Sequence, residues 1–295
     1  MKHYKFGYVA IIGRPNVGKS TILNRLIGQK IAIATNKAQT TRRRINGILT
    51  TDEAQIVFVD TPGIHKPIDK LGECLVDEAK SAIPDVDLVL FVVDGSTTAG
   101  RGDKWIVENV LKDYKGDMLI VVNKYDLVKD IKKREENSLT YKTLFEKNYP
   151  CIKISAKTGR NFDTLTTNIT RKLPAGEKVY DEEQITDETM RDIARELIRE
   201  KILLYTHDEV PHSVAVIIEN YEEKENLDRI EAKIIVEHET QKGILIGKNA
   251  SMLKKIGSEA RKEIEFTADK KVFLDLQVKV IKDWRKKSKD MDKMY

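Results

Sequence analysis

The sequence predicts an α/β domain with a mainly parallel sheet covered by helices, followed by a smaller α+β domain. Short apolar runs alternate with helical stretches as far as Leu173, which is typical of parallel strands joined by crossover helices. Residues 88–93 are hydrophobic without interruption, as in a strand that is buried on both faces. The alternation then stops and a polar stretch follows. We therefore expect a first domain over residues 1–175, a linker over 176–187 and a second domain over 188–295.

Composition is consistent with two such domains. Of the 295 residues, 40% are hydrophobic, which can supply two cores, and 34% are charged. No apolar run approaches the ~20 residues of a membrane span, and the first residues show no signal-peptide pattern. The two cysteines, Cys74 and Cys151, form neither a disulfide framework nor a metal-binding set. A reducing, cytoplasmic location is therefore expected.

The first predicted strand, residues 8–12, leads into a phosphate-binding loop. Residues 13–20 match G-x-x-x-x-G-K-[ST], and an amphipathic helix over residues 20–26 follows. Backbone amides at the start of that helix form an anion site, Lys19 reaches the β- and γ-phosphates, and Ser20 can ligate Mg²⁺. We expect the nucleotide phosphates to be bound by Gly13, Arg14, Pro15, Asn16, Val17, Gly18, Lys19, Ser20 and Thr21.

A second buried strand, residues 57–59, ends in Asp60-Thr61-Pro62-Gly63. In this D-x-x-G pattern Asp60 would hold Mg²⁺ through water, and the Gly63 amide would meet the γ-phosphate. The pattern alone occurs often by chance. Its place at the carboxyl end of a strand, where ligands of open α/β sheets bind, favours the functional interpretation.

The strand at residues 118–122 is followed by Asn123-Lys124-Tyr125-Asp126, which selects the base. The Asp126 carboxylate can accept hydrogen bonds from guanine N1–H and N2–H₂, a donor pair that adenine lacks, so the predicted ligand is GTP or GDP. Asn123 and Lys124 would hold the phosphate loop and flank the base. Ser155-Ala156-Lys157 follows a strand at 151–154 and would back the guanine, with the Ala156 amide aimed at O6. Residues 103–111 and 162–173 are predicted to form covering helices.

Hydrolysis is expected to be slow. Ras-like enzymes place a Gln directly after D-x-x-G to orient the attacking water, but this chain has Ile64 there. Thr41 is predicted to reach Mg²⁺ and the γ-phosphate together with Ser20 and Asp60, with Thr40 as the alternative.

The second domain reads as helix, two strands, helix and strand. Met190, Ile193, Ala194 and Leu197 share one helical face, and residues 214–219 and 233–237 are strand-like, separated by the charged residues 221–228. Residues 243–264 are mostly helical with a Gly-rich start, and residues 272–282 form a final strand. No catalytic cluster lies in this part of the sequence.

Charge is unevenly distributed along the chain. Residues 1–180 contain 30 basic and 21 acidic side chains, residues 181–239 contain 7 and 18, and residues 240–295 contain 15 and 8. Six basic residues surround residues 247–250: Lys242, Lys248, Lys254, Lys255, Arg261 and Lys262. Such segregation predicts one oriented basic face. A solvated charged helix is the alternative.

Four segments together resemble the Era family of bacterial GTPases: residues 13–20, 38–42, 60–65 and 123–126. Residues 242–250 and 256–262 are similar to the KH domain of that family, so the resemblance spans essentially the whole chain. It implies a P-loop GTPase domain and a type II KH domain. The implied function is a GTP-controlled RNA chaperone that binds the 3′ end of small-subunit rRNA during 30S subunit maturation. A monomer in peripheral contact with the inner membrane is expected.

The resemblance also bears on catalysis. In related GTPases the Asn at the position of Asn16 ligates a potassium ion that bridges the phosphates, which implies K⁺-stimulated hydrolysis with Mg²⁺ and K⁺ as cofactors. Asn16, Lys19, Thr41 and Gly63 are then the catalytic residues. Arg14, within the loop itself, is the competing candidate for the role of the potassium ion held by Asn16.

KH domains clamp nucleotides with a G-x-x-G loop, but this chain has Gly247-Lys248-Asn249-Ala250. If the fourth position needs a positive φ, Ala costs roughly 1 kcal/mol there. If it lies in the first helical turn, Ala is as good as Gly or better. The predicted RNA-binding residues are Lys242, Ile244, Ile246, Gly247, Lys248, Asn249, Ala250, Lys254 and Lys255.

Two other functions fit parts of the sequence. An RNA-binding scaffold could use nucleotide binding as a switch, with turnover incidental; product formation at physiological potassium distinguishes it from a GTPase. A small-molecule kinase is disfavoured by residues 123–126 and by the absence of an acceptor-binding lid.

Overall fold

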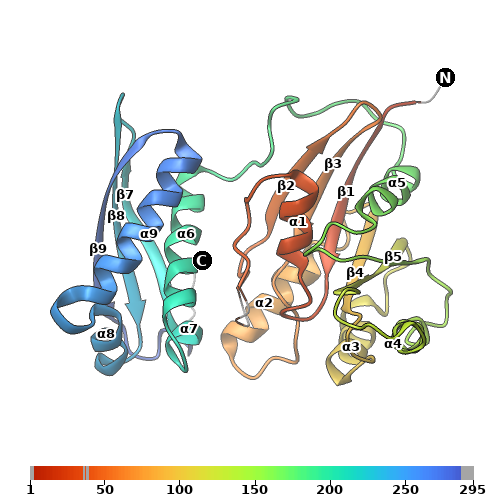
Figure 1. Cartoon of the computed structure of the whole chain (residues 1–295), viewed down its shortest axis with the longest axis horizontal. Helices are drawn as coiled ribbons and strands as arrows, with labels where there is room; N and C mark the ends of the chain where they lie inside the picture. The colour runs from red at the N-terminus through yellow and green to blue at the C-terminus, as the bar shows by residue number, and fades with distance from the viewer. Residues whose placement is uncertain (1–2, 36, 38–39, 287–295) are drawn as a thin grey trace. The chain divides into compact units, whose positions relative to one another are not determined.

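The computed structural model describes residues 3–35, 37 and 40–286. The chain forms two compact units, and the main division falls between Asp187 and Glu188; residues 69–71 and the described residues between 35 and 40 group with the C-terminal unit. A six-stranded sheet with helices on both faces makes up the N-terminal unit, and a three-stranded sheet with helices makes up the C-terminal unit (Figure 1). The predicted fold class of each unit is confirmed.

The N-terminal sheet has the strand order β2-β3-β1-β4-β5-β6. Every neighbouring pair is parallel except β2 and β3, which are antiparallel. The elements are β1 (Lys5–Ile12), α1 (Lys19–Ile27), β2 (Ile45–Thr50), β3 (Ala54–Asp60), α2 (Lys70–Ser81), β4 (Leu88–Asp94), α3 (Arg101–Ile106), a π-helical turn (Val107–Leu111), β5 (Asp117–Asn123), α4 (Ile131–Lys142), β6 (Cys151–Lys153) and α5 (Phe162–Lys172). The sequence had assigned no element to β2, α2 or α4.

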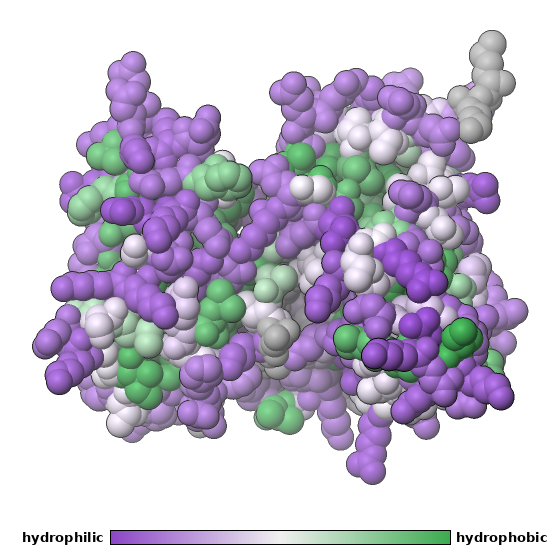
Figure 2. All heavy atoms as spheres, in the orientation of Figure 1, coloured by the Kyte–Doolittle hydropathy of each residue, from purple (hydrophilic) through white to green (hydrophobic). Residues whose placement is uncertain are grey.

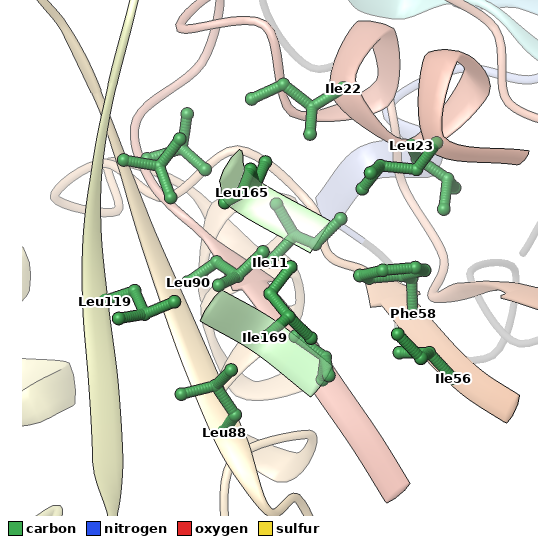
Figure 3. Close-up of a cluster of buried hydrophobic side chains, with 14 of the residues drawn as sticks. Ile11, Ile22, Leu23, Ile56, Phe58, Leu88, Leu90, Leu119, Leu165 and Ile169 are labelled. Carbon is green, nitrogen blue, oxygen red and sulfur yellow. The ribbon is translucent and has the colours of Figure 1, made fainter. Parts of the chain in front are cut away.

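Alternate residues of the central strands fill two separate cores. Ile11 and Leu90 pack with α1 and α5 on one face of the sheet (Figure 3). Ile12 and Phe91 pack with α2, α3 and α4 on the other face. Because side chains alternate along a strand, burial on both faces requires the continuous apolar runs seen in the sequence. This packing fixes the carboxyl ends of β1, β3, β4 and β5 at one edge, where the predicted site residues lie.

The segment predicted as a linker, residues 176–187, lies along β3 and β2. The Gln55 side chain, fully buried on β3, accepts hydrogen bonds from the amides of Val179 (2.8 Å) and Tyr180 (2.9 Å) and donates to the Tyr180 carbonyl (2.8 Å). Thr186 forms an antiparallel bridge with Gly47 of β2. This segment therefore belongs structurally to the N-terminal unit, although its polar composition is typical of a free connection.

The C-terminal unit has the strand order β7-β8-β9, antiparallel between β7 and β8 and parallel between β8 and β9. Apolar side chains of α6 and α9 form one core with this sheet. The elements are α6 (Met190–Tyr205), α7 (Val210–Ser213), β7 (Ala215–Glu222), β8 (Leu227–Val236), α8 (Glu239–Ile246), a 3₁₀ turn (Lys248–Ala250), α9 (Ser251–Ala268), β9 (Lys271–Val280) and a second 3₁₀ turn (Trp284–Lys286).

Two predicted boundaries in this unit were wrong. Residues 223–226 separate the strands, a shorter segment than the expected 221–228, since Tyr221 pairs with Ile230, β7 continues to Glu222 and β8 begins at Leu227. The helix expected from residue 243 begins at Glu239, because the Gln241 side chain accepts hydrogen bonds from the backbone amides that precede it. In both cases a tertiary or capping contact extends the element beyond its apolar pattern.

Hydrophilic side chains cover most of the face shown in Figure 2. Within residues 3–35, 37 and 40–286, no helix combines the length and apolar character needed to span a bilayer.

Candidate nucleotide site and nucleic-acid interface

The phosphate loop connects β1 to α1 through two residues with positive φ, Asn16 (63°) and Gly18 (97°). A Cβ at Gly18 would lie 2.4 Å from Asn123 Nδ2, so both the backbone and the neighbouring side chain require glycine there. Lys19 Nζ lies 3.1 Å from the carbonyl oxygens of Gly13 and of Arg14. The loop thus curls around the ammonium group, as expected for a cradle of phosphates.

Charges in this site are poorly solvated. Burial lowers the pKa of Lys19 to about 8, against the attraction of Asp60. Burial likewise raises the pKa of Asp60 to about 6, although Lys19, Ser20 and Thr41 all favour its charged form. A phosphate beside Lys19 and a cation beside Asp60 would each stabilise the charged side chain.

Three oxygen-bearing side chains meet beside the loop. Ser20 Oγ lies 2.6 Å from Asp60 Oδ2 and 2.9 Å from Thr41 Oγ1, and Thr41 Oγ1 lies 3.4 Å from Asp60 Oδ2. The other carboxylate oxygen, Asp60 Oδ1, is buried with no hydrogen-bond partner. Hard oxygen ligands and an unsatisfied buried carboxylate oxygen fit Mg²⁺, which takes its remaining ligands from water and phosphate.

The structure distinguishes the two switch threonines. Thr41 is buried beside Ser20, whereas the Thr40 hydroxyl donates to the Lys37 carbonyl at 2.6 Å. No cluster of three or more His, Cys, Asp or Glu side chains suited to a metal occurs in the described segments. A divalent cation beside Asp60 would therefore take its other ligands from hydroxyl, water and phosphate oxygens.

Gly63 approaches the phosphate loop closely: a Cβ there would lie 2.7 Å from Pro15 Cα. The preceding Thr61 hydroxyl donates to the Ile11 carbonyl at 2.8 Å, which fixes residues 60–63, including Pro62, against β1. Ile64 is only 1% exposed, and its amide donates to the Gly13 carbonyl at 3.1 Å. A side chain buried in this way packs the core and does not contact an attacking water.

Arg14 contacts α3. Its Nε lies 2.7 Å from Asp103 Oδ1, and the same fully buried carboxylate accepts from the Gly100 amide at 2.8 Å through Oδ2. Asp103 thus caps α3 and holds Arg14 at once. A guanidinium engaged in this way braces the loop, which weakens Arg14 as a candidate for contact with the transferred phosphate.

Residues 123–126, at the carboxyl end of β5, lie on the side of the site where the base is expected. Asn123 Nδ2 donates to the Val17 carbonyl at 2.8 Å, so this side chain holds the phosphate loop as predicted. Lys124, with φ of 60°, forms an ion pair with Asp94 at 2.8 Å, and Asp126 is half-buried two residues later.

The loop at 155–157 differs in one detail from expectation. The Ala156 amide, which was predicted to face guanine O6, donates to Asn123 Oδ1 at 2.9 Å. Ser155 is fully buried, and its hydroxyl accepts from the Thr158 amide at 3.2 Å. Lys157 is exposed at the rim. An O6 contact would therefore need a second donor or a shared one.

Sequence reasoning did not name Asp94, Asp103 or Arg25 as site residues. Asp94 and Asp103 contact Lys124 and Arg14, and Arg25 contacts the loop at 155–157. No local pattern marks these residues, because each acts on a segment far away in the sequence.

The KH-like loop lies between α8 and α9. Gly247, Asn249 and Ala250 have φ of 68°, 53° and 60°. Ala250 is therefore left-handed, which decides between the two interpretations of this position and costs the loop roughly 1 kcal/mol.

Most predicted RNA-binding side chains are accessible around this loop. Lys248, Asn249, Lys254 and Lys255 are exposed, Lys242, Ile246 and Ala250 are half-buried, and Ile244 is 52% exposed. Lys255 Nζ lies 4.0 Å from the centroid of the Tyr205 ring, so a cation–π contact occupies this ammonium group. Of the segment 38–42 that carries part of the family resemblance, residues 38 and 39 lie outside the described residues.

Known proteins resemble both units. The 50S ribosome-binding GTPase family matches residues 8–124, and the KH domain family matches residues 209–285. GTPase Era of Nostoc sp. is 49% identical over 283 residues, which cover 96% of this chain and 86% of that protein.

Two solved structures are similar over nearly the full length. Era in complex with MgGDPNP and nucleotides 1506–1542 of 16S ribosomal RNA has a TM-score of 0.95 and 39% identity, with 99% of each chain covered. A variant of Era from Aquifex aeolicus bound to GDP.AlF4- has a TM-score of 0.94 and 39% identity, with 98% of each chain covered.

Proposed function

The chain belongs to the Era family of GTPases, and on that premise we propose that it is a ribosome assembly factor that binds the 3′ end of small-subunit rRNA. It acts as an RNA chaperone in 30S subunit maturation, and the nucleotide state of its GTPase unit controls when its KH unit binds RNA. The observation that carries the proposal is the full-length similarity to an Era molecule crystallised with MgGDPNP and 16S rRNA nucleotides.

Within the GTPase unit, each part of the nucleotide has a proposed partner. Residues 13–21 and Gly63 hold the phosphates, with Lys19 at the β- and γ-phosphates. Ser20, Thr41 and Asp60 hold Mg²⁺, which neutralises charge that develops on the phosphates. The unsatisfied Asp60 Oδ1 and the short Ser20–Asp60 distance of 2.6 Å support this assignment. Asn123, Lys124, Asp126 and residues 155–157 surround the guanine.

Hydrolysis depends on a potassium ion held by Asn16 in this proposal. Two observations support it: Ile64 is buried, and Arg14 is held by Asp103. The position after D-x-x-G thus offers no polar side chain to the γ-phosphate, and the Arg14 guanidinium is engaged by Asp103. Asn16 is exposed on the loop and adopts the left-handed conformation that Asn tolerates well.

The KH unit grips single-stranded RNA at residues 247–255. Lys248 and Lys254 meet phosphates, and Ile244 and Ile246 offer apolar contact to unstacked bases. The exposure of Lys248, Lys254 and Ile244 supports these roles. The 30S subunit is then the larger partner of a monomer in the cytoplasm, with peripheral contact to the inner membrane; these last assignments rest on the family resemblance alone.

The test is RNA binding by a variant that carries Lys248→Asp and Asn249→Asp. Asp adds repulsion at the phosphate clamp, and it tolerates the left-handed conformation at residue 249. Binding to a single-stranded oligonucleotide from the 3′ end of small-subunit rRNA should be abolished, while GTP hydrolysis should be kept. Wild-type affinity should fall with added salt, as phosphate contacts require.

A matched control makes the same chemical change elsewhere in the KH unit. Lys224→Asp with Asn226→Asp places the same charges in the exposed turn between β7 and β8, and should bind RNA like the wild type. Undiminished binding by the Lys248/Asn249 variant would exclude the loop as the RNA clamp. Absence of GTP turnover by the wild type at physiological potassium would favour a nucleotide-switched scaffold.

A further inference from the structure

Arg25, in the second turn of α1, holds the loop that follows β6. Its Nε donates to the Ala156 carbonyl at 2.6 Å, and its Nη2 donates to the Lys157 carbonyl at 2.9 Å. The guanidinium also lies 5.8 Å from the centroid of the Phe162 ring. One planar side chain thus fixes two successive carbonyls by charge-assisted hydrogen bonds, which are about twice as strong as neutral ones.

Glycine at position 159 leaves room for this contact. Gly159 has φ of 84°, and a Cβ there would lie 2.8 Å from Arg25 Nη1. The guanidinium therefore occupies the space that a side chain at residue 159 would need, and the turn at Gly159 packs against Arg25.

Holding these carbonyls also sets the direction of an amide. The Ala156 carbonyl and the Lys157 N–H belong to one peptide plane and point in opposite directions. When Arg25 holds the carbonyl, the Lys157 N–H is directed away from α1. The Ala156 N–H is engaged by Asn123 Oδ1 at 2.9 Å, so it is the Lys157 N–H that Arg25 orients.

The same residues connect the two halves of the nucleotide site. Asn123 holds the loop through the Ala156 amide and holds the phosphate loop through the Val17 carbonyl. Arg25 holds the base loop from α1, the helix that begins at Lys19. The loop at 155–157 is thus attached to the phosphate-binding segment twice, through the N–H and through the carbonyl of Ala156.

We infer that Arg25 is a positioning residue for guanine recognition, which directs the Lys157 amide toward the exocyclic oxygen O6 of the base. The inference rests on the proposed binding of a guanine nucleotide at this site. Arg25 itself touches neither base nor phosphate in this arrangement. Its contribution is that a donor is already in place when the nucleotide arrives, which lowers the cost of ordering the loop.

The experiment compares GDP with 6-thio-GDP, in which sulfur, a weaker hydrogen-bond acceptor, replaces O6. Arg25→Ala should weaken GDP binding by about tenfold, the equivalent of one charge-assisted hydrogen bond, but should weaken 6-thio-GDP binding much less. The preference of the wild type for GDP should therefore shrink. Arg25→Lys keeps the charge but not the two-pronged geometry, so it should restore part of the preference.

Two controls separate positioning from a general loss of structure. Inosine diphosphate lacks only the amino group that Asp126 is proposed to meet, so the ratio of its affinity to that of GDP should be the same in every variant. Arg171→Ala removes an exposed arginine from α5 of the same unit and should leave both ratios unchanged.

Equal losses for GDP and 6-thio-GDP in Arg25→Ala would overturn the inference and leave Arg25 a structural residue. An unchanged GDP affinity would overturn it as well. Failure of the wild type to bind GDP would instead overturn the proposed function.

Discussion

The loops that precede α1 and α9 both end in a left-handed residue, but they differ in burial and in the hydrogen bonds that they receive. Gly18 before α1 has φ of 97°, and Ala250 before α9 has φ of 60°. Hydrogen bonds from Asn123, Lys19 and Ile64 all converge on the first loop. In the second loop none of Lys248, Asn249 and Ala250 is buried.

This difference indicates how each loop can change. In the buried loop, a new atom at Gly18 or Gly63 meets fixed neighbours, and removal of a donor leaves a buried carbonyl unsatisfied. The exposed loop has fewer such constraints, so it tolerates alanine at a left-handed position for a modest conformational cost. A substitution at the left-handed residue before each helix should therefore impair function strongly at Gly18 and have only a small effect at Ala250.

The largest effect is expected for Gly18→Ala. Its Cβ would lie 2.4 Å from Asn123 Nδ2 at a φ of 97°, so we expect GDP affinity to fall. A loss of at least about thirtyfold follows from overpacking of about 1–3 kcal/mol together with left-handed strain of about 1–2 kcal/mol. Gly28→Ala is the matched control, since Gly28 has φ of 79° at the other end of α1 with open space around it. Equal losses of nucleotide binding in both variants would contradict the steric explanation.

The second-largest effect is expected for Asp126→Asn, which should change the base specificity. The amide matches the 2-carbonyl of xanthine and loses the acceptor pair for guanine, so preference should shift from GTP toward XTP by about a hundredfold. Competition binding with both triphosphates measures it. Asp130→Asn, which keeps an N-cap residue on α4, should leave the preference unchanged. A variant at Asp126 that still prefers GTP would exclude this carboxylate as the guanine reader.

The rate of GTP hydrolysis should be about tenfold higher in K⁺ than in Na⁺. This is less than a cation at the transition state can contribute at most. Replacing Na⁺ with K⁺ at fixed ionic strength should raise the rate in the wild type, and Asn16→Ala should remove most of that difference. Asn16→Gly removes the side chain without strain at φ of 63° and should behave in the same way. Ile64→Val, a change in the core, should keep the potassium effect; equal wild-type rates in both salts would count against the ion.

The smallest effect is expected in the exposed loop. Ala250→Gly relieves a left-handed alanine and should stabilise the C-terminal unit by up to about 1 kcal/mol in urea unfolding. RNA affinity should change little. Ala268→Gly, at the end of α9, should instead destabilise by about 0.5–1 kcal/mol because residue 268 is helical. A destabilised Ala250→Gly variant would show that the methyl group has packing contacts that offset its strain.

Local sequence was sufficient for the parts of the site that lie within a few residues of each other. The phosphate loop, residues 60–63 and residues 123–126 each follow an apolar strand, and the structure places all three at one edge of the sheet. Hydrophobic periodicity predicted most elements because burial on one or both faces imposes it. It did not predict α4, whose twelve residues are mainly polar, with Asn137, Ser138 and Tyr141 as its buried residues.

Tertiary structure decided what depends on partners distant in sequence. Asp103 meets Arg14 across 89 residues, and Arg25 meets Ala156 across 131. Likewise, the φ of Ala250 follows from how α8 and α9 are joined, which its residue type alone could not specify. By itself the sequence determined the chemical groups of the site and the strands that carry them. Strand order and register then determined which groups meet, because each contact joins elements that only the assembled sheet brings together.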